Sequence, residues 1–432
     1  MRTMALVVVV VAGLACGKKD EAPVAGTKVA TTPGALLTEP EYAQRLIAEL
    51  KKHGEKAALH FDAAKSMITD GEMQLSTKNI YAEYVKLPPE DRETAFAHVV
   101  ATFSQLDQES EKSLAVVRAK LLPAVRAGMY FDWQLQHAGK EPLPAQRAVY
   151  VPIGEMTGAG VAIDEDNSMQ IATDKQLAAW GVTIDQALDI ATKNLARKGT
   201  PFEQVQRGLW TSPAHDNYDA SRLLLLDEIK KLGLKGTVVA MIPNRDTLYL
   251  AGSDDPKALL AMADLAEKAA EEPRPIHTVP VCLTGTRWAD CEPGSTEEVR
   301  QRMHTVAIAG RQSLYGEQKE TLQEKLGEDV FVASYTVFED TATKHRTSYA
   351  TWTKTVPTLL PHADQIMFVE AATEDPDKAT VLGSVPWDRA MAVIGAHLTP
   401  DGRSPPRWAT GDYYPSPAEL ARLAPTKISK KK

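Results

Sequence analysis

The pattern of apolar and polar positions is most regular between residues 217 and 272, where it predicts a helix, a β-hairpin and a second helix. The leucine-rich start is too continuous for one narrow stripe, so the first helix is predicted to be buried on most sides. The unbroken apolar run at 238–242 predicts a strand covered on both faces, with residues 247–251 as its partner. Asp255 and Pro256 predict the start of the second helix, because the carboxylate can cap it and proline needs no amide hydrogen bond there.

The remaining pattern predicts an α+β fold in which helices combine with antiparallel and mixed sheets. Thr38 and Thr183 are each followed by Glu or Gln three residues later, which predicts two helix starts with capping boxes. Residues 109–127 are predicted to be helical, with Pro123 ending or kinking the helix. The glycine cluster at 157–160 is interpreted as a turn that opens a strand.

The composition is that of an ordinary globular protein. The 432 residues are 44% hydrophobic and 25% charged, and this length suggests about two or three domains. The formal net charge is −8 and the pI is near 5.8. These values argue against nucleic-acid binding, because contacts to phosphates need a basic surface.

The N-terminus has the pattern of a signal peptide. Arg2 supplies a positive charge, and residues 4–15 form an apolar run of twelve residues. About 20 apolar residues are needed to span a bilayer, so this run predicts a cleaved signal peptide and not a transmembrane helix. A plain secretory signal cleaved near Ala15 is one interpretation.

The other interpretation rests on Cys16, which directly follows small and apolar residues and resembles the lipobox of bacterial lipoproteins. The resemblance implies that Cys16 is diacylated and becomes the first residue of the mature protein. The next residue is Gly17, not the aspartate associated with retention in the inner membrane. The resemblance therefore favours the outer membrane, if the host has one.

With Cys16 assigned, two of the three cysteines remain, Cys282 and Cys291. Their segment is predicted to be a hairpin that turns about Thr286 and Arg287 and places the two cysteines opposite each other. In an oxidising compartment this arrangement predicts a cross-strand disulfide. A reduced buried pair, or half of a metal site, is the alternative.

The sequence contains no nucleophile elbow, no phosphate-binding glycine loop and no H-E-x-x-H motif, so it predicts no catalytic residue, metal or cofactor. Two polar loops, at 215–221 and 244–246, border the apolar core. An arginine among short polar residues beside a helix start is typical of carboxylate or phosphate binding. The candidate ligand-binding residues in these loops are Asp219, Ser221, Asn244, Arg245 and Asp246.

The same residues also have a purely structural interpretation. In this alternative, Asp219 caps the following helix, while Asn244 and Asp246 build a turn. Arg245 then makes a structural ion pair and binds no ligand.

Several segments in succession resemble a widespread bacterial family, the domain of unknown function numbered 1444. The segments are STKNIYAEYVKLPPEDR, VTIDQALDIATKNL, NYDASRLLLLDEI, IPNRDTLYLAGSDDPKAL and the closing hairpin with Trp288. The resemblance covers roughly residues 40–293, about 60% of the chain. Members of this family have no assigned activity, so the resemblance implies no catalytic residues.

The chain is thus predicted to have five regions. They are a signal peptide with a lipobox at 1–16, a flexible spacer at 17–38, an α+β region at 39–295 with its central unit at 174–295, a C-terminal β-rich extension at 296–415 and a basic tail at 416–432. The extension shows the same order of strand, hairpin and helix as residues 205–272, so it is interpreted either as a repeat of that unit or as a separate β-rich addition.

These patterns predict a cell-envelope lipoprotein, exported and held at the membrane by its lipid. The predicted role is a non-enzymatic binding or interaction module whose partner is an envelope protein or a small anionic ligand. The alternative is a hydrolase or transferase that uses polar residues of the loops at 215–221 and 244–246.

Overall fold

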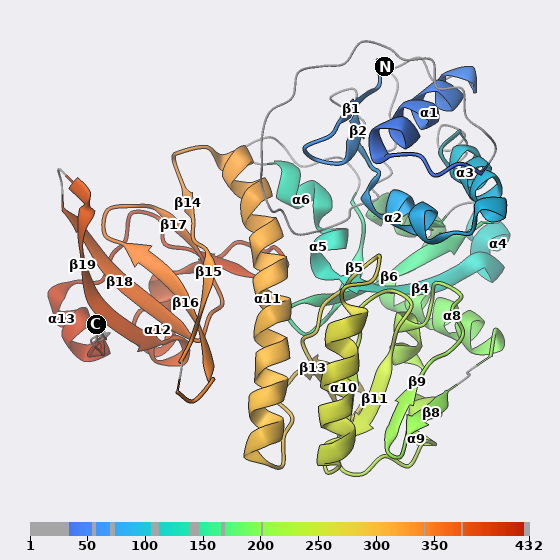
Figure 1. Ribbon diagram of the computed structural model, residues 1–432. Helices are drawn as coiled ribbons and strands as arrows, with labels where there is room; N and C mark the ends of the chain where they lie inside the picture. The colour runs from blue at the N-terminus through green and yellow to red at the C-terminus, as the bar shows by residue number, and fades with distance from the viewer. Residues whose placement is uncertain are drawn as a thin grey trace.

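Helices and mostly antiparallel sheets are combined along the whole chain, which confirms the predicted α+β class (Figure 1). The computed structural model describes residues 34–53, 58–69, 74–104, 112–138, 147–165, 169–199, 202–340, 342–372 and 375–426. No helix in these ranges is both long enough and apolar enough to cross a bilayer. The predicted signal peptide, Cys16 and most of the spacer lie outside the described residues.

The N-terminal part packs three helices around a small antiparallel sheet. Its elements are α1 (Glu39–Lys52), β1 (His60–Asp62), β2 (Met67–Thr69), β3 (Gln74–Ser76), α2 (Lys78–Lys86) and α3 (Pro89–Ser104). The predicted capping box begins α1, because the Thr38 amide donates to the Glu41 carboxylate at 2.8 Å. The ring of Tyr42 on α1 packs against Tyr84 and Phe96, which joins the three helices.

The second part is a four-stranded antiparallel sheet in which β6 pairs with β4 on one side and with β5 and β7 on the other. Its elements are α4 (Leu114–Val117), η2 (Arg118–Lys120), β4 (Leu121–Ala127), α5 (Gly128–Phe131), α6 (Trp133–Ala138), β5 (Tyr150–Ile153), β6 (Thr157–Asp164), β7 (Met169–Ile171), α7 (Asp174–Trp180) and α8 (Ile184–Arg197). The Thr183 capping box begins α8 as predicted.

The prediction that residues 109–127 are helical is wrong for most of the described stretch. Only two short helical turns precede β4, which is a strand with all seven residues buried. Pro123 fits this strand because β4 pairs only with β6 among the described strands. Proline is tolerated in an edge strand, where its missing amide hydrogen removes no ladder bond.

The interpretation of residues 157–160 as a turn is also wrong, since these residues lie inside β6. The rings of Phe131 and Tyr150 stack 4.9 Å apart against this strand. A Cβ atom at Gly158 would lie 2.4 Å from the Tyr150 ring, and one at Gly160 would lie 2.5 Å from the Phe131 ring. The two glycines therefore serve close packing of aromatic rings on the strand and not a change of chain direction.

The third part is a six-stranded antiparallel sheet with the order β13-β12-β10-β11-β9-β8. Its elements are β8 (Glu203–Gln206), β9 (Leu209–Thr211), η3 (Ala220–Leu224), α9 (Leu226–Lys230), β10 (Val238–Met241), β11 (Tyr249–Gly252), α10 (Pro256–Ala269), β12 (Val281–Thr284) and β13 (Arg287–Asp290). The predicted hairpin is confirmed as β10 and β11. Asp255 caps α10 as predicted, because its Oδ1 accepts a hydrogen bond from the Ala258 amide at 3.1 Å.

The first predicted helix of this unit differs from the prediction. It consists of the 3₁₀ helix η3 and the short helix α9, separated at Leu225. The cap predicted at Asp219 is not formed, because its side chain makes no capping hydrogen bond. Asn217, two residues earlier, has a positive φ of 70°. The Asp219 carboxylate is instead used inside the protein by residues that precede the helix.

The predicted disulfide between Cys282 and Cys291 is present, with an S–S distance of 2.07 Å. The predicted register of the hairpin is wrong, because Cys282 pairs with Ala289 and the turn includes Gly285. Gly285 has a positive φ of 65°, which suits glycine in a tight hairpin turn. Cys291 lies just beyond the end of β13, yet its Cα atom is only 5.7 Å from that of Cys282.

A long helix, α11 (Glu297–Leu326), opens the region that the sequence predicted to be a β-rich extension. Figure 1 shows α11 running between α10 on one side and the C-terminal strands on the other. Its buried residues include Val299 and Met303, which join the core around α10, and Leu314 and Tyr315, which belong to a different part of the core. Because the helix is covered on more than one side, its apolar positions form no single stripe.

Beyond α11 the extension is β-rich as predicted, with two four-stranded sheets, β14-β17-β21-β20 and β15-β16-β18-β19. Its elements are β14 (Phe331–Val332), β15 (Tyr335–Glu339), β16 (Arg346–Thr353), β17 (Thr358–Pro361), β18 (Gln365–Ala372), β19 (Asp375–Pro386), α12 (Trp387–Ile394), η4 (Gly395–His397), β20 (Thr399–Pro400), β21 (Arg407–Ala409) and α13 (Pro417–Leu423). The helix α13 occupies the start of the predicted basic tail, and residues 427–432 lie outside the described ranges.

The extension shares an element order with the central unit but not its strand pairing. In the central unit, β9 pairs antiparallel with β11, the second strand of the hairpin. In the extension, β16 pairs parallel with β18, the first strand of the hairpin. The same order of elements therefore gives two different sheets.

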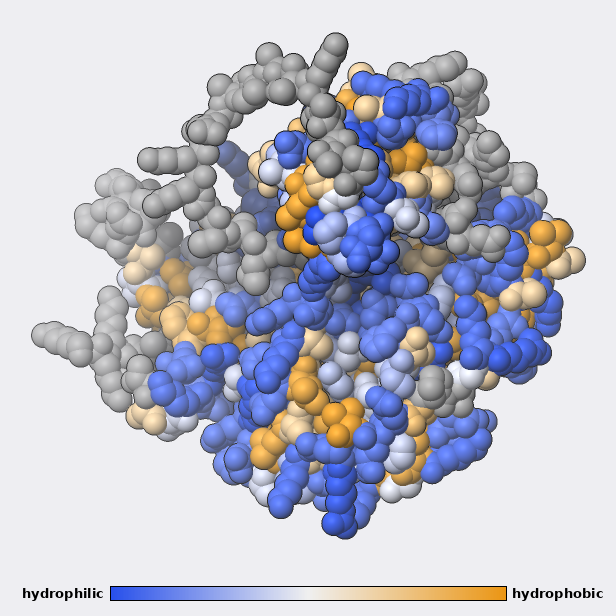
Figure 2. Space-filling model, turned by 45° about the vertical axis from the view of Figure 1, so that its right-hand side comes forward, coloured by the Kyte–Doolittle hydropathy of each residue, from blue (hydrophilic) through white to orange (hydrophobic). Residues whose placement is uncertain are grey.

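One continuous apolar core joins the second and third parts to the extension. It includes Val125 of β4, Leu250 of β11, Leu314 of α11 and Trp352 of β16. The face shown in Figure 2 is mostly hydrophilic, with small and scattered hydrophobic patches. Scattered apolar surface of this kind is normal for a folded protein.

Candidate functional site

The two polar loops of the sequence prediction meet beside the end of β4. The Ala220 amide donates to the carbonyl oxygen of Arg245 at 3.1 Å, so the loops are bonded to each other. The Ser221 hydroxyl accepts a hydrogen bond from the Val125 amide of β4 at 3.0 Å. The Arg245 amide donates to the carbonyl oxygen of Arg274 at 3.0 Å. The candidate residues thus come from loops that surround one edge of the second sheet.

Asp219 and Ser221 are fully buried and serve the interior of the protein. Oδ1 of Asp219 accepts hydrogen bonds from the Ser212 hydroxyl at 2.6 Å and from the Ala214 amide at 3.0 Å. Oδ2 of Asp219 is buried and has no hydrogen-bond partner among the residues that the structure describes. These contacts hold the loop to the end of β9 and leave neither side chain facing solvent.

Asn244, Arg245 and Asp246 have the geometry of the structural alternative. The Asn244 amide group donates to the carbonyl oxygen of Ala269 at 2.7 Å, and its Oδ1 accepts from the Asp246 amide at 2.9 Å. Arg245 pairs with both carboxylate oxygens of Asp246, from Nε at 3.0 Å and from one amino group at 2.9 Å. The side chain of Arg245 is 15% exposed, so the pair is partly buried.

The same edge of the sheet carries a buried arginine that the sequence analysis did not single out. Arg126 of β4 is only 6% exposed. Its guanidinium donates to the carbonyl oxygen of Val125 at 2.7 Å, and its other amino group lies 4.0 Å from the Met169 sulfur. No carboxylate of the described residues lies within ion-pair distance of it. Burial without a counterion lowers the pKa of Arg126 to about 10, and repulsion from Arg245 adds to this effect.

Tyr130 of α5 shares this environment. Burial raises the pKa of its hydroxyl, while the positive charges of Arg126, Arg274 and Arg245 oppose the rise. The hydroxyl makes no hydrogen bond to any described residue. Arg274 is paired with Glu83, including one bond of 2.8 Å. The site therefore combines three guanidinium groups with the two carboxylates of the Arg245 and Arg274 ion pairs, which leaves the charge of Arg126 without a counterion.

The sequence held a signal for Arg126, but the predicted secondary structure concealed it. Arg126 is the one charged residue in the apolar stretch from Leu121 to Phe131. On a helix, an arginine in such a stretch would take the exposed face. In the strand β4 the same residue is buried, which makes its charge costly.

A second group of titratable residues lies where the extension meets the rest of the protein. The Glu155 carboxylate is 2.8 Å from Nδ1 of His362, and His362 packs against the rings of Trp387 and Trp408 at 5.0 and 5.6 Å. Burial raises the pKa of Glu155, but the hydrogen bond to His362 and the charges of His362 and Arg311 together outweigh it, so the net pKa is lowered. Asp290 accepts a hydrogen bond from the Glu155 amide at 3.3 Å, and burial raises the pKa of Asp290 to about 6.

The described residues include no set of three or more His, Cys, Asp or Glu side chains placed to bind a metal ion. No protein-family model, no curated protein and no solved structure matches this chain. The resemblance to family 1444 therefore stays a prediction that rests on the sequence segments alone.

Proposed function

We propose that this protein is a cell-envelope lipoprotein that binds a small anionic ligand without catalysing a reaction. The observation that carries the proposal is the guanidinium of Arg126, buried at the end of β4 with no carboxylate partner in the described parts of the chain. A buried charge is costly unless it is paired, so such a group is expected where a ligand supplies the opposite charge. The Tyr130 hydroxyl and the ion-paired Arg245 lie around it and provide further hydrogen-bond donors and positive potential.

Export is supported by two features that are independent of the ligand site. The leader with Cys16 has the pattern of a lipoprotein signal. The disulfide between Cys282 and Cys291 fits an oxidising compartment, because cytosolic thiols are normally kept reduced. Both features point to a folded body outside the cytoplasm on a lipid tether.

A binding role is favoured over catalysis by the way the polar groups are used. Asp219 and Ser221, which a hydrolase or transferase would need as base and nucleophile, are engaged in hydrogen bonds inside the loops. Among the described residues at this edge, Arg126 has no carboxylate partner and the Tyr130 hydroxyl makes no hydrogen bond, so the groups open to a ligand are donors and a positive charge. Such a set binds and orients an anion but supplies no base.

The lipid anchor predicts that the wild-type chain incorporates a palmitate analogue when it is expressed in a bacterial host with lipoprotein processing. The variant Cys16→Ser should lose this label and leave the membrane fraction, because the acylated sulfur is gone. Labelling and fractionation measure both effects. A wild-type chain that stays unlabelled, with its first sixteen residues intact by mass spectrometry, contradicts the anchor.

The anion site predicts opposite effects of one substitution with and without ligand. Without added ligand, Arg126→Met should raise the free energy of unfolding by about 1–2 kcal/mol, because it removes a buried charge that lacks a counterion. Inorganic phosphate, sulfate, acetate and citrate are the probes. At least one of them should raise the melting temperature of the wild type, since a ligand at 100 times its Kd adds about 2.7 kcal/mol. Arg126→Met should abolish that rise.

The matched control is Arg118→Gln, which removes an exposed arginine at the start of η2, eight residues before Arg126. It should leave both the stability and the response to anions unchanged. Equal responses of the wild type and Arg126→Met to every probe would rule out Arg126 as the anchor of the ligand. If none of the four anions changes the melting temperature of the wild type, the proposal that the ligand is an anion is contradicted.

A further inference from the structure

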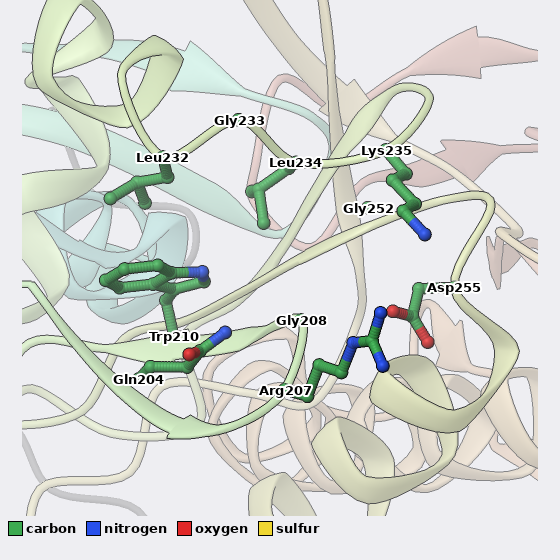
Figure 3. Close-up of a pocket in the computed structure, with 10 residues that line it drawn as sticks. All are labelled: Gln204, Arg207, Gly208, Trp210, Leu232, Gly233, Leu234, Lys235, Gly252 and Asp255. Carbon is green, nitrogen blue, oxygen red and sulfur yellow. The ribbon is translucent and has the colours of Figure 1, made fainter.

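A pocket of about 170 Å³ lies at the opposite end of the β10–β11 hairpin from the Arg245 turn. The β8–β9 hairpin and the turn that follows α9 form its walls (Figure 3). It is smaller than the pockets that hold drug-sized ligands, which commonly measure about 300–1,000 Å³. It therefore suits a small molecule with one compact apolar group.

Two glycines allow the backbone segments around this pocket to approach closely. A Cβ atom at Gly252 of β11 would lie 2.1 Å from the carbonyl oxygen of Lys235. Gly208 has a positive φ of 83°, and a Cβ atom there would lie 2.4 Å from the Asp255 carboxylate. A larger residue at Gly252 would collide with the backbone of Lys235, so it would force these two segments apart. At Gly208 the neighbour is the Asp255 side chain, and the positive φ itself favours glycine.

The pocket has an apolar end and a charged end. In Figure 3 the indole of Trp210 and the side chain of Leu232 lie at one end, and Leu234 lies between them and the charged residues. The three apolar residues are only partly buried, although they pack against the main core. An apolar ligand group that covered them would remove this surface from water, which stabilises a complex by about 25 cal/mol per Å².

Arg207 and Lys235 form the charged end, together with Asp255. Neither cation makes an ion pair with a carboxylate among the described residues. Asp255 already accepts the hydrogen bond that caps α10, from the Ala258 amide at 3.1 Å. This end thus has two cations and one carboxylate, and that carboxylate already caps α10. The charge that a ligand could neutralise here is therefore positive.

We propose that this pocket binds a small monocarboxylic acid with an aromatic or branched aliphatic body. The body lies against Trp210, Leu232 and Leu234, and the carboxylate lies between Arg207 and Lys235. The pocket is separate from the anion site at Arg126, which lies near the Arg245 turn at the other end of the hairpin. The protein would then recognise two chemically distinct anions.

The test compares acids with neutral amides of the same shape on the detergent-solubilised full-length chain. The probes are phenylacetate with phenylacetamide, and 4-methylpentanoate with its amide, titrated by ligand-observed NMR. At least one acid should bind the wild type at least ten times more tightly than its amide. The double variant Arg207→Gln with Lys235→Gln should bind that acid at least ten times more weakly and leave the amide unchanged.

Two controls separate this site from general effects of charge and from the Arg126 site. Arg287→Gln removes an exposed arginine at the far edge of the same sheet and should bind the acid like the wild type. Arg126→Met tests the other site: an acid that loses its tight binding in this variant is bound at Arg126, which would overturn its assignment to the pocket. Three results would each overturn the proposal. They are equal binding of acid and amide, undiminished binding by the double variant, and no binding of either acid at 20-fold excess over millimolar protein.

Discussion

Substitution of Arg407 by methionine is expected to lower the free energy of unfolding by about 3–5 kcal/mol, because several buried acceptors lose their donor. Arg407 lies in β21 with no exposed surface, and its guanidinium donates only to uncharged oxygens. Its partners are Oε1 of Gln318 at 2.5 Å and the carbonyl oxygens of Ala333, Leu359 and Tyr315 at 2.8, 3.2 and 3.2 Å. Methionine would remove all four of these hydrogen bonds. The Leu359 carbonyl oxygen keeps a hydrogen bond from the Ala333 amide at 3.1 Å, but Oε1 of Gln318 and the carbonyl oxygen of Ala333 would lose the bonds from Arg407, and each unsatisfied buried group costs about 1–3 kcal/mol.

Urea unfolding of the wild type and of Arg407→Met measures this effect. Arg389→Met is the matched control, because Arg389 is exposed and makes a single bond, to the carbonyl oxygen of Arg422 at 3.2 Å. It should change the stability by less than about 0.5 kcal/mol. A loss below 1 kcal/mol for Arg407→Met would mean that the acceptors find other donors.

The same substitution at Arg126 is expected to have the opposite effect on stability. Both arginines are buried, and burial lowers the pKa of each to about 10. Arg407 satisfies four acceptors, whereas Arg126 donates to one carbonyl oxygen and approaches one sulfur. The same change to methionine is therefore expected to destabilise the protein at position 407 and to stabilise it at position 126. Only the second outcome is typical of a group kept for a ligand.

Acid is expected to destabilise the protein through His277. This residue is 3% exposed; its Nδ1 accepts from the Val279 amide at 3.1 Å and its Nε2 is 2.5 Å from the Thr157 hydroxyl. Burial, with repulsion from Arg311, lowers its pKa from 6.5 to about 3. Below pH 6.5 the unfolded chain binds a proton that the folded chain does not, so stability is lost as the pH falls towards 3. Between pH 7 and 3.5 this loss amounts to about 4 kcal/mol.

The variant His277→Asn lacks this titration but keeps an acceptor for the Val279 amide. Between pH 7 and 3.5, the wild type should lose about 4 kcal/mol more stability than His277→Asn in denaturant unfolding. Burial raises the pKa of Asp132 and of Asp290 to about 6, which favours the folded state as the pH falls. These two groups are common to both chains and cancel in the comparison.

His60→Asn serves as the control for this experiment, because His60 is an exposed residue of β1. Its pH profile should follow that of the wild type. Parallel profiles for His277→Asn and the wild type would show that the folded protein accepts a proton on His277 at little cost.

Part of the proposed ligand site could be predicted from the sequence. Arg245 and the two polar loops were recognised because turn-forming residues interrupt apolar runs there, and such signals are local. Arg126 was missed because its importance depends on burial, and burial depends on whether β4 is a strand. That choice is made by pairing with β6, whose partner residues lie thirty or more positions further along the chain.

The sequence by itself determined the local features, which form between residues only a few positions apart. The caps of α1, α8 and α10 and the β10–β11 hairpin depend on bonds between near neighbours, and all of them are present. The disulfide also links cysteines only nine residues apart, so its prediction was correct although the predicted register of the hairpin was wrong.

Only the tertiary structure decided what depends on distant segments. Residues 121–127 form a strand, and α11 is covered on more than one side. Gly158 and Gly160 leave room for aromatic rings to pack against β6. The tertiary structure also decided that Arg407 has four oxygen acceptors, whereas Arg126 has one carbonyl oxygen and one sulfur atom among the described residues. A side chain's partners across the fold, and not its neighbours in sequence, set the cost of its charge, because desolvation depends on everything packed around it.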